Sequence, residues 1–118
     1  MDRNQHRVQI NILPVHEGDC IHLRFQSSDG WHNIVVDSGP AASAETFRNL
    51  MDSIRKRGEC VDLLCFSHMD DDHIKGAEMT FRENRFQTSH IKNIWLNVPD
   101  SAVPSDPASN LPTYQYIT

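Results

Sequence analysis

The sequence has few cysteines, no excess of basic charge and no long apolar run. Its three cysteines are odd in number and lack CxxC spacing, which argues against a disulfide framework and against a cysteine zinc site. The net charge of −5 does not indicate a strongly basic nucleic-acid binder, although a bound metal ion can supply local positive charge. No apolar run reaches the ~18 residues of a membrane helix, and the polar first residues contain no signal-peptide core. We therefore expect a cytoplasmic protein with no membrane partner.

The length of 118 residues suits one small domain. The apolar fraction of 38% is low for a domain that buries its own core. Either another chain or segment completes part of the apolar surface, or the C-terminal residues are mostly loop.

The first forty residues show the period-2 alternation of half-buried strands. Residues 8–13 and 20–25 alternate apolar and polar side chains, and residues 33–37 are rich in β-branched side chains. Residues 27–30 have the composition of a hairpin turn. The sequence therefore predicts three short strands, with a loop after Asp37.

The period then changes to that of an amphipathic helix, with Phe47, Leu50, Met51 and Ile54 on one stripe. Ser43 is placed to cap its N-terminus, and Gly58 stands where a helix-terminating glycine belongs.

The remaining elements are predicted from apolar runs and from proline content. Residues 61–67 predict a central strand covered on both faces, residues 76–84 a short helix and residues 91–97 another strand. We divide the chain into a folded unit, residues 1–97, and a proline- and serine-rich loop or linker, residues 98–118. The end of that second segment has the composition of an unfinished strand or helix.

The residues with the clearest chemistry follow the central strand directly, in the segment Ser67 to Gly76. Imidazole and carboxylate groups suit Zn²⁺ or a similar divalent ion. Three consecutive aspartates would repel one another without a cation, so a solvated acidic loop is the weaker interpretation. The four candidate ligands are His68, Asp70, Asp72 and His73.

Other polar and aromatic residues have simpler interpretations. Asp71 is read as a supporting or solvent-facing group. His16 lies near the Gly18 turn and is read as a surface residue, with an approach to the metals as the alternative. The remaining histidines and both tryptophans are read as strand, turn or packing residues: His22, His32, His90, Trp31 and Trp95.

The segment His68-x-Asp70-x-Asp72-His73 resembles the HxHxDH signature of metallo-β-lactamase-fold hydrolases, with Asp70 in place of the second histidine. This HxDxDHxxG variant is similar to the branch that contains the hydrolase domain of bacterial DNA-uptake channel (competence) proteins. Residues 17–23 and 33–39 also resemble the opening strands of that family, which end in D-[ST]-G. The similarity covers roughly residues 8–97.

The resemblance implies a role for each of these side chains. His68 and Asp70 would bind a first divalent metal, Asp72 and His73 a second, and Asp37 would support the metal-binding segment from beneath. Zinc is the expected metal and manganese the alternative. Asp72 is also assigned a catalytic role, and a metal-activated hydroxide would attack the substrate. Ser67 and Gly76 would serve loop geometry.

The resemblance also implies an α+β fold, the N-terminal half of an αββα sandwich with a mixed or antiparallel sheet and flanking helices. The family's later metal ligands have no counterpart here. We therefore expect a C-terminal half of the same fold on another chain or fragment, and no activity from this chain alone. A nuclease or phosphodiesterase acting on nucleic acid is the first choice. A small-molecule ester hydrolase and a non-catalytic metal-binding or regulatory half-domain are the alternatives.

Overall fold

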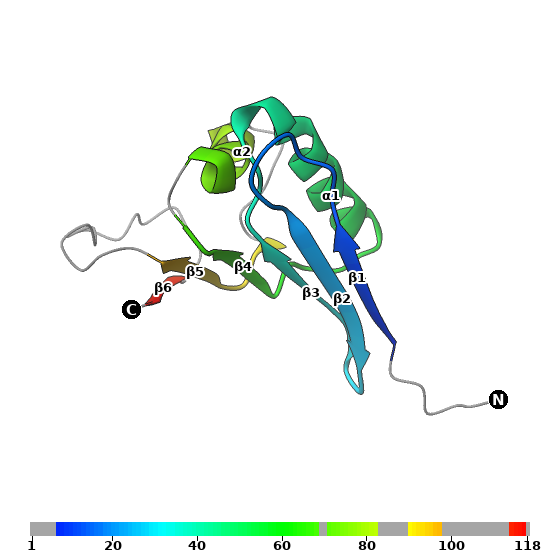
Figure 1. Ribbon diagram of the computed structural model, residues 1–118. Coiled ribbons are helices and arrows are strands. Elements are labelled where there is room, and N and C mark those ends of the chain that lie inside the picture. The colour runs from blue at the N-terminus through cyan, green and yellow to red at the C-terminus, as the bar shows by residue number, and fades with distance from the viewer. Residues whose placement is uncertain (1–6, 69–70, 83–89, 98–113, 118) are drawn as a thin grey trace.

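The computed structural model describes residues 7–68, 71–82, 90–97 and 114–117 (Figure 1). The elements in chain order are β1 (Val8–Ile12), β2 (Ile21–Ser27), β3 (Gly30–Val36), the 3₁₀ turn η1 (Ala41–Ser43), α1 (Ala44–Lys56), β4 (Leu63–Phe66), α2 (Asp71–Arg82), β5 (Ile94–Asn97) and β6 (Tyr114–Ile117). No helix in these ranges is long and apolar enough to cross a membrane.

The strands form one six-stranded mixed sheet in the order β1-β2-β3-β4-β5-β6. The first three strands pair antiparallel, and β3, β4, β5 and β6 pair parallel. Parallel neighbours need a crossover, and α1 connects β3 to β4 while α2 connects β4 to β5. The predicted α+β class with a mixed sheet is therefore confirmed. β6 lies within the segment that the sequence assigned to loop or linker, and it extends the sheet beyond β5.

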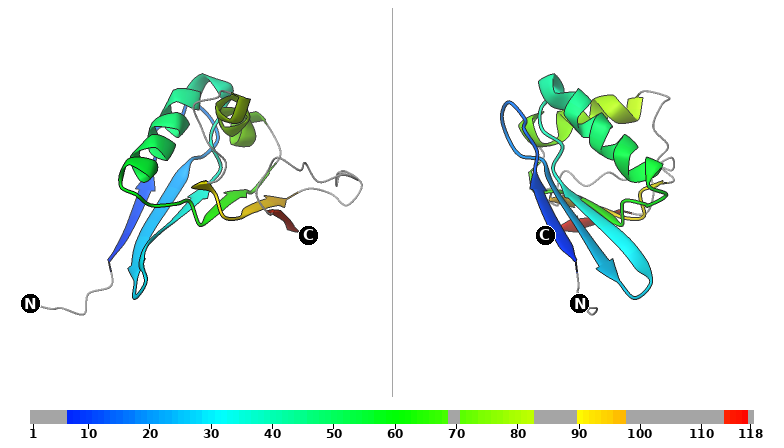
Figure 2. Two further views of the ribbon diagram at one scale, coloured as in Figure 1. Left: turned by 180° about the vertical axis from the view of Figure 1, so that it is seen from behind. Right: turned by 90° about the vertical axis from the view of Figure 1, so that its right-hand side faces the viewer.

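Both helices cover the same face of the sheet, as the two views of Figure 2 show. On that face, alternate strand residues such as Val35, Leu64 and Ile94 pack against the apolar stripes of the helices. Phe47 and Ile54 of α1 lie at the centre of this core and are almost completely buried. The helix layer therefore fixes which strand side chains point inward.

The sequence predicted α1 well because its stripe and its terminator are both local signals. The four predicted stripe residues are all buried. Gly58 has φ +75°, and its N–H donates to the carbonyl of Arg55 while the N–H of Glu59 donates to that of Ile54. This pattern is a Schellman termination, which favours glycine at the left-handed position. The cap prediction was wrong in its contact, because Ser43 makes no side-chain cap bond and its Oγ accepts from the N–H of His16 (3.0 Å).

The predicted start of the second helix was also wrong. Helix α2 begins at Asp71, not at Gly76, so most of the predicted acidic loop is the first turn of a helix. The positive end of the helix dipole favours carboxylates in that turn. The helix dipole therefore offsets part of the repulsion between the aspartates, even without a bound cation.

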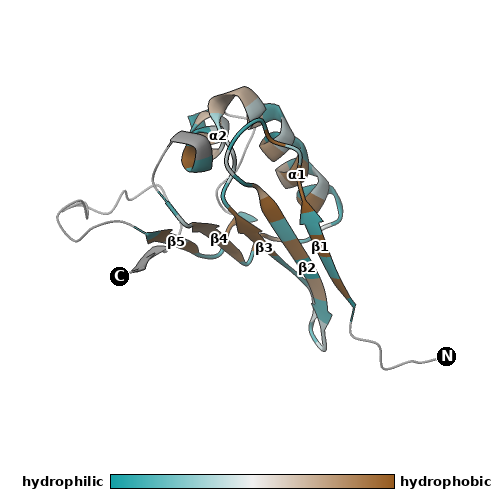
Figure 3. Cartoon of the chain, in the orientation of Figure 1, coloured by the Kyte–Doolittle hydropathy of each residue, from teal (hydrophilic) through white to brown (hydrophobic). Residues whose placement is uncertain are grey.

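No helix or second sheet among the described residues covers the opposite face of the sheet (Figure 1), and hydrophobic and hydrophilic residues alternate along β2 (Figure 3). The register of the strands places these apolar residues on that face: Val8, Ile10, Ile12, Ile21, Leu23, Phe25, Ile34, Val36, Leu63, Cys65 and Trp95. Those of β1 and Trp95 are exposed, and the others are half-buried. We call this set the outer apolar face.

Polar side chains tie β2 and β3 to the end of α1. His22 is buried, its Nε2 donates to Oδ1 of Asn33 (2.8 Å), and its Nδ1 accepts from Asn11 (3.3 Å). The amide of Asn33 donates in turn to Oε1 of Glu59 (3.0 Å), whose carboxylate also pairs with Arg24 through two hydrogen bonds. Because every partner is satisfied, this network explains His22 as a structural residue.

Candidate metal centre

The candidate centre lies where β3 and β4 end side by side. These strands are parallel neighbours, so their carboxyl ends meet at one edge of the sheet. Residues 37–39 follow β3, and Ser67 and His68 follow β4. His73 lies in the first turn of α2, which begins next to the same edge. The topology thereby brings residues 37–39 together with Ser67, His68 and His73, which lie about thirty residues further along the chain.

Asp37 is the anchor of this arrangement. It is almost completely buried and adopts a positive φ of 62°, which is uncommon for a residue other than glycine. Its Oδ1 accepts from the backbone N–H of Ser67 (2.8 Å), and its Oδ2 accepts from Oγ of Ser67 (2.6 Å) and from Nδ1 of His73 (2.9 Å). The side chain therefore holds the end of β4 and the start of α2 at the same time.

The contacts of Asp37 also determine the orientation of both imidazoles. Since the hydroxyl proton of Ser67 is donated to Asp37, its Oγ accepts from Nδ1 of His68 (3.1 Å). His68 and His73 are therefore both protonated at Nδ1, and in the neutral rings the lone pairs lie on Nε2. The ring centroids are 5.0 Å apart. Carboxylate-anchored histidines of this kind are typical metal ligands.

The loop after β3 holds α2 close to the sheet. The backbone N–H of Ser38 donates to the carbonyl of His73 (2.8 Å), and its Oγ accepts from the N–H of Ala77 (2.8 Å). The N–H of Gly76 donates to the carbonyl of Gly39 (2.9 Å). A Cβ at Gly76 would lie 2.6 Å from the Ser38 carbonyl oxygen, so glycine is required for this approach.

A residue that the sequence did not single out as a ligand also reaches the centre. Asp19, Asp37 and His73 each place a potential ligand atom within 4.8 Å of the others. Asp37 already accepts three hydrogen bonds and bonds directly to His73, so we read it as a support rather than a ligand. Exposed Asp19 remains as the carboxylate that faces His73. Its Gly18-Asp19 turn was visible in the sequence, but only the fold brings it to this edge.

The other predicted site residues are placed as follows. His68 is exposed next to Ser67, and His73 is half-buried. Asp70 lies outside the described residues. Asp71 and Asp72 belong to the first turn of α2, and only their backbone is described. The proximity of His68 and His73 is therefore observed, while the assignment of four ligands to two metals stays a prediction.

The cysteines lack the character of metal ligands. None of the three forms a disulfide. Burial, together with a smaller contribution from the negative charge of Asp37, raises the pKa of Cys20 to about 12. The pKa of Cys65 is raised by burial and then by the same carboxylate. Since the thiolate is the binding form, Cys20 and Cys65 behave as small apolar side chains, in agreement with the sequence argument against a cysteine zinc site.

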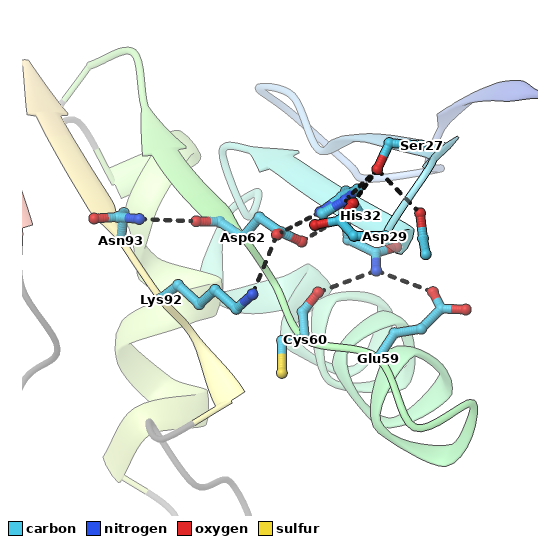
Figure 4. A network of polar contacts seen from close by, with 10 residues as sticks. Ser27, Asp29, His32, Glu59, Cys60, Asp62, Lys92 and Asn93 are labelled. Carbon is cyan, nitrogen blue, oxygen red and sulfur yellow. Dashed lines mark hydrogen bonds and ion pairs between the residues drawn. The ribbon is translucent and has the colours of Figure 1, made fainter. Parts of the chain in front are cut away.

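A second polar cluster lies at the other end of β4, around His32 (Figure 4). Nδ1 of His32 contacts Asp62 (2.8 Å), and its Nε2 contacts both Asp29 and Ser27 (2.8 Å each). The contacts from Ser27 to His32 and from His32 to Asp62 resemble a serine-histidine-aspartate triad. However, the hydrogen bonds to Asp62 and then Asp29 raise the pKa of His32, and the Ser27 hydroxyl donates to Asp29. A charged imidazole between two carboxylates is not a base, so this cluster fastens the β2–β3 hairpin to β4.

Comparison with known proteins gives matches in structure only. No family model and no curated protein matches the sequence. A metallo-β-lactamase with a HARLDQ motif from Cronobacter sakazakii, and its HARLDQ motif mutant, each match at 15% identity and a TM-score of 0.53, over 92% of this chain and 44% of theirs. A subclass B3 metallo-β-lactamase from a soil metagenome library matches at 19% identity and a TM-score of 0.44, over 84% of this chain and 40% of its own. The chain thus spans less than half the length of these enzymes. Its helices and sheet form a metallo-β-lactamase-type fold over that part.

Proposed function

We propose that this protein is a metal-dependent hydrolase, most specifically a nuclease or phosphodiesterase, and that the chain supplies the first part of a two-metal site. The observation that carries the proposal is the pair His68 and His73, held in one tautomer by Asp37 at the end of two parallel strands. The HxDxDH pattern adds Asp70 and Asp72 to this pair as carboxylate ligands.

The donor set fits divalent zinc, with manganese as the alternative. Two imidazoles whose lone pairs lie on Nε2, together with nearby carboxylates, provide the nitrogen and oxygen ligands that zinc binds. In the proposed assignment, His68 and Asp70 hold one ion and Asp72 and His73 the other. Bound metal would make hydroxide available from water near neutral pH.

The residues of this chain would contribute positioning to the reaction. Asp37 keeps both imidazoles oriented, and its three hydrogen bonds resist their rotation. Asp72 is proposed to act in catalysis as well as in binding. Asp19 faces His73 and would add a carboxylate near the second ion. The substrate preference for nucleic acid rests on the resemblance of the HxDxDH pattern, and a small-molecule ester is the other outcome of the test.

The outer apolar face supports the proposal of a second half. This face gathers eleven apolar residues, four of them exposed and seven half-buried, whereas the surface hydrophobics of ordinary soluble proteins are scattered. A sheet face that carries apolar side chains is stabilised when another layer packs against it. We propose that a C-terminal half of the same fold, on another chain or fragment, packs a second sheet here and supplies the remaining metal ligands.

The test is an assay of the protein purified with its co-purifying polypeptide. Plasmid DNA is incubated with Zn²⁺ or Mn²⁺, with and without chelator, and in parallel with bis(p-nitrophenyl) phosphate and a p-nitrophenyl carboxylate ester. Asp72→Ala should abolish cleavage, whereas Asp71→Ala, the neighbouring substitution on the same turn, should retain most of it. Cleavage of the carboxylate ester alone would replace the nuclease by an esterase. Metal binding without turnover of any substrate would favour the regulatory half-domain.

A further inference from the structure

Strand β1 forms one edge of the sheet, and its hydrogen bonds to β2 show which of its residues face outward. The N–H of Leu13 donates to the carbonyl of Cys20 (2.9 Å), and the N–H of Gln26 donates to that of Arg7 (3.0 Å). Antiparallel residue pairs alternate between hydrogen-bonded and non-bonded, so the odd-numbered residues from 7 to 13 bond to β2. The even-numbered residues point their backbone groups away from it.

Three consecutive even-numbered residues therefore offer backbone donors and acceptors at the edge. These are Val8, Ile10 and Ile12, and nothing in the described ranges pairs with them. Their side chains are 60%, 65% and 79% exposed. Edge strands are usually protected by lysine, proline or a bulge, and residues 8–12 contain none of these. An open, uncharged and apolar edge of this kind favours pairing with another strand.

The order of residues in β1 indicates which strand fits. The sequence Val-Gln-Ile-Asn-Ile is nearly symmetric about Ile10 in the size and polarity of its side chains. In an antiparallel pair centred on Ile10, each apolar residue lies opposite an apolar residue. Gln9 then lies opposite Asn11 of the second strand, so the amides also match.

We propose that a second copy of this chain pairs with β1, strand against antiparallel strand, with Ile10 of each copy opposite the other at a two-fold axis. The outward-facing residues form three bonded pairs, which corresponds to about six backbone hydrogen bonds. Residues 8–12 carry no charge, so no like charges oppose one another. Because the contact is the same on both copies, the assembly closes at two and does not grow into a fibre.

The proposed pairing is independent of the metal chemistry. It extends the sheet at its edge, whereas the proposed second half covers the outer apolar face. An inactive dimer would therefore leave the pairing proposal intact. Because Ile10 also belongs to the outer apolar face, the pairing is judged by the oligomeric state of its variants and the proposed hydrolase by Asp72→Ala.

The first test removes the outward-facing N–H of residue 10 while keeping all hydrogen bonds between β1 and β2. The N–H of Ile10 points outward, so Ile10→Pro deletes no bond to β2, and proline is tolerated on such edges. Sedimentation equilibrium of the purified 118-residue chain should show a dimer whose dissociation constant rises about tenfold or more in the variant. Gln9→Pro is the matched control, because its N–H belongs to the ladder with β2 and its loss should lower the thermal midpoint.

The second test examines the two-fold register and does not depend on proline. Ile10→Lys and Ile10→Glu should each be monomeric, because like charges meet at the axis, and should keep the circular dichroism spectrum of the wild type. Mixing the two variants in equal amounts should restore a dimer. A wild-type chain that is monomeric at every concentration, an Ile10→Pro variant that stays dimeric, or a mixture that stays monomeric would overturn the proposal.

Discussion

The substitution Gly76→Ala should destabilise this protein, although the same change in an exposed helix interior usually stabilises. Alanine is favoured over glycine in a helix by about 1 kcal/mol. At Gly76 the added Cβ would lie 2.6 Å from the Ser38 carbonyl oxygen and 3.1 Å from that of Gly39. Both neighbours are backbone atoms, so they cannot rotate away as a flexible side chain would. Relief requires α2 to move from the loop that follows β3.

The magnitude follows from the size of that movement. Ordinary contact begins at 3.4 Å, so α2 must shift by about 0.8 Å along the Cβ direction. Overpacking of a tight contact typically costs 1–3 kcal/mol. Because the contacts at 2.6 and 3.1 Å are both with backbone atoms, we take the upper part of that range, about 2–3 kcal/mol. Subtraction of the helix-propensity gain of about 1 kcal/mol leaves a net loss of about 1–2 kcal/mol in the free energy of unfolding. The shift also strains the contacts from Ser38 to His73 and Ala77, so zinc affinity should fall as well.

Urea unfolding followed by circular dichroism measures the first effect, and calorimetric zinc titration measures the second. Lys75→Ala is the control, because Lys75 lies next to Gly76 on α2 and, among the described side chains, pairs with the half-exposed Glu78. That control should change stability by no more than about 0.5 kcal/mol. If Gly76→Ala were as stable as the wild type or more so, the close approach of α2 to the loop after β3 would be refuted.

Three further predictions address the anchor, the added carboxylate and the buried histidine. Asp37→Asn should lower the free energy of unfolding by about 2–3 kcal/mol and weaken zinc binding about 10- to 100-fold, because three buried donors lose their carboxylate partner. Urea unfolding measures the first effect and calorimetric titration the second. An unchanged zinc affinity would count against the anchoring role of Asp37. Asp19→Asn should weaken zinc binding about tenfold while the thermal midpoint stays constant. Glu17→Gln, in the same loop, is the control. Equal zinc affinities for the two variants would show that Asp19 does not belong to the metal centre. Burial lowers the pKa of His22, so the unfolded chain takes up a proton first and stability should fall as pH drops below about 6.5. The raised pKa of His32 acts in the opposite direction, so the loss is measured as the difference in thermal midpoint between the wild type and His22→Gln from pH 8 to 5; a difference that does not change with pH would refute it. The pKa of Glu59, lowered to about 2 chiefly by its hydrogen bond with Arg24, adds a separate loss only below about pH 4.5.

Local signals in the sequence were sufficient for α1 and for most strands. The stripe of α1 and its glycine terminator depend on residues that are close in sequence, so both were predicted. The start of α2 was missed because the helix dipole and the contacts of Ser38 favour helix where the aspartates suggested a loop. The failure of Ser43 as a cap has a similar origin, since His16, distant in sequence, takes its hydroxyl oxygen.

The sequence predicted which segment forms the candidate centre, but not how its side chains are arranged in space. The sequence identified His68 and His73, and the family resemblance identified Asp37 as a support. The contact of Ser67 with Asp37, which orients His68, depends on β3 and β4 ending side by side. The proximity of Asp19 to the centre depends in the same way on the position of the β1–β2 loop. Contacts between segments distant in sequence leave no periodic signal, so the fold alone reveals them.

The central claim is that His68 and His73 bind metal through Nε2. Asp37 accepts the Nδ1 proton of His73, and the Ser67 hydroxyl oxygen, oriented by Asp37, accepts that of His68. Long-range proton–nitrogen NMR spectra of the imidazoles, recorded during zinc titration of the purified protein, test this claim most directly. We expect the Nε2 resonances of these two histidines to move to the range of metal-bound nitrogen, while their Nδ1 resonances stay in the protonated range and His22 and His32 do not change. Zinc-induced shifts at His32 instead, or none at His68 and His73 at saturating zinc, would contradict the claim.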